Sequence, residues 1–305
     1  MVLGLGNSII SGAALDSGYV NQYSLQLDGV GDGLLVDRTS ALRCEDTNSF
    51  TMGGWVSNEY GWSTNSVTDF IIASNHGGGF QIGVVANRKV TAQVDLNDGS
   101  GGSNQSLSIN AAFDSSQFGY SSGTNTGYST GDDGYQFIVM TLDTTSGTGV
   151  FKLYIGGGGL GTTVSKSNDV HLVGTANATS GNDTINYAYT GWGLDRDISI
   201  GYKDQGSSTP IQHMTGFIDE AFIMNAALSH DQLKTVYNNG TGIDMTKASG
   251  ALGGGAAYSP GSNLVGLWRM DEGGDATTVE DSSGNNHTAT IQGDPTWSTT
   301  MRQAI

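Results

Sequence analysis

Short segments in which apolar and polar residues alternate recur along most of the chain, and they constrain its fold more than any other feature. A period of two is typical of β-strands that bury one face, and Gly, Asn and Asp separate the segments as they do in turns. The chain has 48 Gly and 3 Pro but no collagen-like repeat. This pattern, with almost no helix, predicts an all-β sandwich. The expected strands are 23–27, 33–36, 49–56, 70–73, 80–85, 90–96, 135–142, 149–155, 197–202, 216–224 and 264–270.

One short helix is expected directly after the strand at 216–224. Ser229 and Gln232 have the spacing of a capping box, and Leu228 and Leu233 have that of a hydrophobic staple. Gly240 is placed to end the helix in a left-handed conformation.

The strand before this helix carries two adjacent carboxylates among apolar residues. Simple alternation places Phe217, Asp219, Ala221 and Ile223 on one face and Glu220 on the other. Because a buried carboxylate without a partner is costly, the pair is expected to hold a cation or backbone donors, or to do chemistry.

The acidic composition disfavours two classes of partner. The net charge is −17, whereas binding to nucleic acid or to an anionic membrane surface depends on Lys and Arg. The single cysteine, Cys44, excludes an intrachain disulfide and a cysteine metal cluster. The first residues do not resemble a secretory signal, and no apolar run approaches the ~18 residues of a membrane span.

The sequence is expected to divide into four segments. Residues 1–22 form an N-terminal arm and residues 23–247 form the sandwich. Residues 248–262, rich in Gly, Ala and Ser, are a linker. Residues 263–305 are a C-terminal β segment, which at this length would be marginally stable alone.

Aromatic residues in loop-like sequence are candidates for contact with a ligand or partner. Long Ser-, Gly- and Asn-rich stretches at 97–134 and 166–193 are typical of functional or interfacial loops, although their aromatic residues could instead fold back on the sheet edges. The candidates are Trp62, Tyr120, Tyr128, Tyr189 and Trp192.

Several short motifs follow one another in a characteristic order. They are SLQLDG at 24–29, FTMGGWV at 50–56, IVMTLD at 138–143, FKLYIG at 151–156, GFIDE at 216–220 and ALS at 227–229. In this order the chain resembles the laminin-G-like, concanavalin-A-like lectin/glucanase family over about residues 23–240. The resemblance implies a two-sheet antiparallel jelly-roll sandwich, with two curved sheets packed face to face.

The chain departs from this family in one respect. A segment like 264–297 usually precedes the first of these motifs, and here it follows the helix. This order suggests a circularly permuted arrangement or strands donated to a neighbouring copy. A small separate C-terminal module is the rival interpretation.

The resemblance also implies a calcium ion (Ca2+) at the rim of the sandwich. Such an ion would be held by Asp28 and Asp32 from the Asp-Gly turn, by Asp219 from the late strand, and by backbone carbonyls. The alternative is that Asp28 and Asp32 only accept hydrogen bonds within their turn.

Glycoside hydrolysis is the enzymatic alternative. Retaining enzymes need two carboxyl groups about 5–5.5 Å apart, and glucanases of this superfamily carry them as Glu-x-Asp-x-x-Glu. Here Asp219 and Glu220 are adjacent, with Met224 and Asn225 beyond them. The absence of that spacing predicts a protein that is not an enzyme.

The chain also resembles laminin-G-like virion proteins of tailed bacteriophages, through residues 1–6 and the NLVGLWRM motif at 263–270. This similarity implies a structural protein displayed on a capsid or tail, assembled in the host cytoplasm and partnered by other virion proteins and by copies of itself. Its two terminal segments would dock by strand addition. The alternative is a calcium-dependent carbohydrate-binding lectin module that binds host-surface glycans through the loop aromatics.

Overall fold

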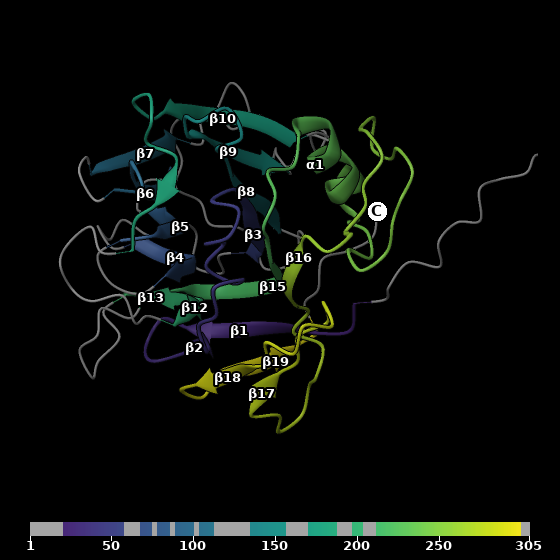
Figure 1. The fold of residues 1–305 in the computed structure, drawn as a ribbon. Helices are drawn as coiled ribbons and strands as arrows, with labels where there is room; N and C mark the ends of the chain where they lie inside the picture. Colours follow the sequence, from purple (N-terminus) through teal and green to yellow (C-terminus); the bar gives the residue numbers. More distant parts are fainter. Residues whose placement is uncertain are drawn as a thin grey trace, which may run out of the picture.

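A computed structural model of the protein describes residues 21–57, 68–74, 78–85, 89–100, 104–112, 135–156, 170–187, 197–203 and 212–299. This part of the chain is an all-β sandwich of two antiparallel sheets with one short helix, as the alternation predicts (Figure 1). No helix within these ranges has the length and apolar character needed to cross a membrane.

The first sheet, sheet A, has eight strands in the order β10-β9-β8-β3-β15-β1-β19, with β16 also paired to β15. Their bounds in that order are Val170–Asn177, Val150–Gly156, Gln136–Asp143, Phe50–Ser57, Thr215–Met224, Ser24–Asp28, Thr296–Ser298 and, for β16, Leu264–Trp268.

The second sheet, sheet B, has nine strands in the order β11-β6-β5-β4-β12-β2-β18-β17, with β7 also paired to β6. Their bounds in that order are Thr184–Ile185, Lys89–Asn97, Phe80–Val85, Thr68–Ser74, Ile198–Ile200, Gly33–Val36, Ala289–Gln292, Thr278–Val279 and, for β7, Gln105–Ala112. A separate two-stranded sheet pairs β13 (Tyr202–Lys203) with β14 (Gln212–His213).

Two apolar clusters show which sheet faces are buried. The larger cluster fills the space between the sheets, where the Phe50 ring lies 5.7 Å from that of Phe80 and 6.5 Å from that of Phe151. The second cluster covers the other face of sheet A, where Tyr237 of the helix stacks on Trp55 with ring centroids 5.4 Å apart. Sheet A is therefore buried on both faces. Among the described residues, neither cluster covers the outer face of sheet B.

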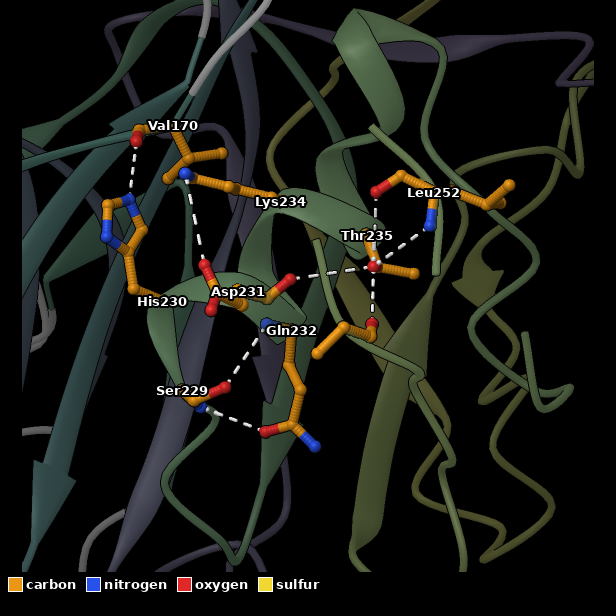
Figure 2. Close-up of polar contacts among 9 residues, drawn as sticks. Val170, Ser229, His230, Asp231, Gln232, Lys234, Thr235 and Leu252 are labelled. Carbon is orange, nitrogen blue, oxygen red and sulfur yellow. Dashed lines mark hydrogen bonds and ion pairs between the residues drawn. The ribbon is translucent and has the colours of Figure 1, made fainter. Parts of the chain in front are cut away.

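The helix α1 (His230–Tyr237) confirms the predicted capping box (Figure 2). Gln232 N–H donates to Ser229 Oγ at 3.2 Å, and Ser229 N–H donates to Gln232 Oε1 at 2.9 Å. The helix ends earlier than expected, because Asn238 already adopts the left-handed conformation at φ 42°. Gly240 instead lies in the following 3₁₀ turn, η1 (Asn238–Gly240).

Residues 248–262, expected as a linker, pack against this helix. Buried Thr235 contacts the backbone of Leu252 (Figure 2). Its hydroxyl also donates to the Ala256 carbonyl at 2.5 Å. Ala256 N–H donates to the Asp231 carbonyl at 2.9 Å. The close approach needs glycine, since a Cβ at Gly255 would lie 2.0 Å from the Asp231 carbonyl oxygen.

The C-terminal segment supplies strands to both sheets of its own chain. Strand β16 pairs with β15, β19 pairs with β1, and β18 pairs with β2. The fully buried Trp268 of β16 donates its indole N–H to the His287 carbonyl at 2.8 Å. In Figure 1 the yellow strands β18 and β19 lie beside the purple β1 and β2 from the start of the described chain.

Strand β15 contains a β-bulge that simple alternation does not anticipate. After Asp219 the pairing with β3 shifts by one residue, and Glu220 has a positive φ of 45°. Phe217 therefore packs in the cluster with the helix, whereas Ala221 and Ile223 pack between the sheets. The prediction that these residues share one face is wrong. Because of the bulge, simple alternation does not place Asp219 and Glu220 on opposite faces of the sheet.

Candidate functional site

The three residues proposed to bind calcium do not lie together. Asp28 and Asp32 belong to one turn, where Asp28 Oδ1 accepts the Val30 N–H at 2.6 Å and Asp32 Oδ2 accepts the Asp28 N–H at 3.0 Å. Asp28 pairs with Thr215, so Asp219 lies four residues further along β15, at roughly 13 Å for an extended strand. Within the described ranges no three His, Cys, Asp or Glu side chains could hold a metal ion. These residues do not fit one shared calcium ion.

Asp32 instead joins two distant parts of the chain. Its Oδ1 accepts the Asp294 N–H at 2.9 Å, across 262 positions of sequence. Asp32 is only 3% exposed. Burial raises the pKa of Asp32 above its usual value, although hydrogen bonds from the two backbone N–H groups act to lower it. The carboxylate thus holds the turn after β1 to the segment between β18 and β19.

The carboxylates of β15 are closed to substrate. Asp219 is fully buried and Glu220 is 4% exposed. The Asn21 side-chain amide donates a hydrogen bond to Asp219 Oδ2. Because neither acid reaches the surface, β15 offers no accessible pair of carboxyl groups.

The loop aromatics proposed as ligand contacts lie outside the described residues. They are Trp62, Tyr120, Tyr128, Tyr189 and Trp192.

The outer face of sheet B carries a polar surface. Strand β6 alternates strictly, with Val90, Ala92, Val94 and Leu96 in the core between the sheets. The intervening positions Thr91, Gln93, Asp95 and Asn97 therefore face outward. On the neighbouring edge strand β7, Ser106, Ser108 and Asn110 pair with outward residues of β6 and are exposed.

Four polar side chains, from β5, β6 and β13, form one chain of hydrogen bonds. Lys203 Nζ donates to Gln81 Oε1 at 2.6 Å, and Gln81 Nε2 donates to Gln93 Oε1 at 3.3 Å. Gln93 Nε2 in turn faces the two oxygens of Asp95 at 3.3 and 3.4 Å. We call Gln81, Gln93, Asp95 and Lys203 the polar ladder. It is half exposed except at Asp95, which is 3% exposed.

The charged groups at the ends of the polar ladder are held at a cost to stability. Burial raises the pKa of Asp95 to about 6, although hydrogen bonds from Ser106 and Gln93 and the charge of Lys203 act to lower it. Burial also lowers the pKa of Lys203, whose ammonium lies 5.1 Å from the centre of the Phe70 ring. Strong pKa perturbation with a named charged partner is typical of functional sites.

The polar ladder can both donate and accept hydrogen bonds. Each glutamine offers two N–H donors and a carbonyl acceptor, whereas the carboxylate of Asp95 is buried beneath Gln93. Serine hydroxyls of β7 extend this capacity, since Ser106 pairs with Asp95 and Ser108 with Gln93.

The polar ladder was not predicted from the sequence, although part of its signal is present there. The alternation in β6 identified a strand, and its polar positions are the ones that face outward. What single-strand periodicity could not supply was the register that aligns Gln81 with Gln93, or the position of Lys203 over β4.

Comparison with known proteins supports the fold. The sequence matches no protein-family model and no curated protein. A putative carbohydrate binding protein from Bacteroides ovatus has a similar structure, with a TM-score of 0.50 and 13% identity, over 90% of this chain and 60% of that one. The CBM40 of a Ruminococcus gnavus sialidase covers 68% of this chain and 96% of that one, at a TM-score of 0.41 and 12% identity. The match to a botulinum neurotoxin D/C binding domain spans 74% of this chain and 47% of the neurotoxin chain, with a TM-score of 0.43 and 16% identity. At 13% identity the likeness to the Bacteroides ovatus protein concerns the sandwich fold alone.

Proposed function

We propose that this protein is a non-catalytic carbohydrate-binding sandwich whose ligand contacts the outer face of sheet B. The observation that carries the proposal is the polar ladder, on a face that neither apolar cluster covers among the described residues. The similarity in fold to a putative carbohydrate binding protein agrees with it.

The chemistry of the polar ladder suits sugar hydroxyls. A hydroxyl both donates and accepts, so a surface that recognises several of them needs both kinds of group. The two half-exposed amides and the exposed serines of β7 provide this mixture, and the buried carboxylate of Asp95 holds the Gln93 amide in place. Polar groups that a bound ligand covers give specificity, because a ligand without the matching group leaves them unpaired.

A binding role fits the chain better than hydrolysis. Glycosidases use a pair of carboxyl groups, whereas the polar ladder contains only one carboxylate, and the acids of β15 are buried. Calcium is not part of the proposal, because Asp28, Asp32 and Asp219 are not arranged to share an ion.

A glycan array tests the proposal. The wild-type chain is compared with Gln93→Ala, which interrupts the polar ladder, and with Gln26→Ala, which removes a half-buried glutamine from sheet A. Losing one or two hydrogen bonds should weaken glycan binding by about tenfold in Gln93→Ala, with Gln26→Ala unchanged. Equal binding by all three proteins would contradict a site on sheet B.

A place on a virus particle is a second proposal, which rests on the sequence resemblance of residues 1–6 and 263–270 to bacteriophage virion proteins. It is compatible with glycan binding, since a protein displayed on a particle can adsorb to surface sugars. Antibody labelling of purified particles would test it. Particles that assemble with none of this chain would contradict the second proposal and leave the first standing.

A further inference from the structure

We infer that the ligand of this face is an extended glycan chain that crosses β5, β6 and β7 over one row of side chains. The row consists of Gln81, Gln93 and Ser108, and we call it the cross-strand row. The inference rests on the proposed function and specifies the shape of its ligand. It follows from strand register and from the exposure of the outward side chains.

Strand register aligns the three side chains. Gln93 of β6 pairs directly with Gln81 of β5 on one side and with Ser108 of β7 on the other. Directly paired residues point to the same face of a sheet, and neighbouring strands lie about 4.8 Å apart. The cross-strand row therefore spans roughly 10 Å, which is about the length of two linked pyranose rings. A glycan chain laid across the strands meets each member in turn.

The exposed polar surface is poorer along β5 and β6 than across them. Outward positions on one strand lie about 6.8 Å apart. Next to Gln93 on β6 are Asp95, only 3% exposed, and the single hydroxyl of half-exposed Thr91. Next to Gln81 on β5 is Gly83, which is buried and has no side chain. A chain along either strand would thus meet fewer accessible donors and acceptors than a chain across them.

The cross-strand row has a definite length. Ala73 of β4 pairs with Gln81 and so shares its face, yet it is fully buried. Strand β13 packs against β4, and its Lys203 Nζ lies 2.6 Å from Gln81 Oε1. On the other side the row ends at the exposed Ser108. Sugar units beyond this length gain no further contact with the row.

Each glutamine of the row keeps hydrogen-bonding capacity for a ligand. An amide has two N–H donors and an oxygen with two acceptor sites. Gln81 gives one N–H to Gln93 and accepts one hydrogen bond from Lys203, which leaves it one donor and one acceptor site. Such an amide can bind two neighbouring hydroxyls of one sugar ring, donating to one and accepting from the other. The row therefore suits chains whose rings keep neighbouring hydroxyls free.

The test is isothermal titration calorimetry with linear oligosaccharides of cellulose, mannan and xylan, whose rings keep such hydroxyls, from single sugars to chains much longer than the row. Affinity should rise by about tenfold from the single sugar to a chain of about two or three units, and then level off. Gln81→Ala and Ser108→Ala should each weaken binding of that chain by about fivefold. The matched controls are Thr91→Ala and Asn110→Ala, in the next row of β6 and β7, with affinities within about twofold of wild type. Far-UV circular dichroism and urea unfolding establish that each variant is folded.

The outcomes separate the two proposals. A single sugar that binds as tightly as the longer chains would overturn this inference and leave carbohydrate binding in place. Binding of other glycans on the array, with none of these linear chains bound, would do the same. Wild-type affinity in folded Gln81→Ala or Ser108→Ala, or equal losses in Thr91→Ala and Asn110→Ala, would overturn the path across the strands. Absence of binding to every glycan would overturn the proposed function and this inference with it.

Discussion

The carboxylate of Asp32 is predicted to connect the start of the sandwich to its C-terminal strands. It accepts backbone N–H groups from Asp28 and Asp294 at 3.0 and 2.9 Å while only 3% exposed. Hydrogen bonds to a charged group contribute about 1.5–3 kcal/mol each. Taking the lower value for both, because the N–H groups are only partly buried, Asp32→Ala should lower the free energy of unfolding by about 3 kcal/mol.

Asp32→Asn sharpens this prediction. The amide keeps one oxygen acceptor but turns an NH₂ group towards the other backbone donor, so about half of the loss is expected, roughly 1.5 kcal/mol. Asp37→Ala is the matched control, because Asp37 is exposed at the end of β2 and should change stability by less than about 0.5 kcal/mol.

Urea unfolding of the four proteins, monitored by tryptophan fluorescence, measures these differences. The expected order of stability is wild type and Asp37→Ala first, then Asp32→Asn, then Asp32→Ala. If Asp32→Ala were as stable as Asp37→Ala, the carboxylate would not connect the two segments, and the argument from its hydrogen bonds would be refuted.

The remaining predictions concern the cap, the sheet and the polar ladder. Ser229→Ala should cost about 1 kcal/mol in urea unfolding, because the first turn of α1 loses its side-chain acceptor; no change would argue against the cap. Gly53→Ala should cost about 2 kcal/mol or more, since the new Cβ would lie 2.1 Å from the Ile138 carbonyl oxygen; wild-type stability would contradict this packing. Burial raises the pKa of Asp95 to about 6, so the folded state retains this proton to higher pH than the unfolded state does. Its contribution to stability is therefore lost as pH rises from about 4 to about 6, by roughly 2–3 kcal/mol in all. Comparing the pH dependence of unfolding in wild type and Asp95→Asn isolates this effect, and identical profiles would contradict it.

Local sequence patterns predicted the elements of the fold. Period-two alternation identified the sandwich, and the spacing of Ser229 and Gln232 identified the helix and its cap. These succeed because strand alternation and capping depend on residues only a few positions apart. The end of the helix was misplaced because Asn238 can also adopt the left-handed conformation that Gly240 was expected to supply.

Features that depend on pairing between distant strands could not be predicted. The bulge at Glu220 arises where β15 shifts its register against β3, and it overturned the assignment of faces. The separation of Asp219 from Asp28 follows from the register of β1 against β15. Likewise, the polar ladder needs Lys203, Gln81 and Gln93 from three strands, which no single segment places together.

Side-chain amide signals of Gln81 and Gln93 provide the most direct test of the central claim, that glycans bind at the polar ladder. A two-dimensional NMR titration of the ¹⁵N-labelled chain with a glycan selected on the array would follow these NH₂ groups and the backbone of β5, β6 and β7. The account predicts saturable shifts centred on those strands. Shifts confined to another surface, such as the turn that contains Asp28 and Asp32, would contradict it.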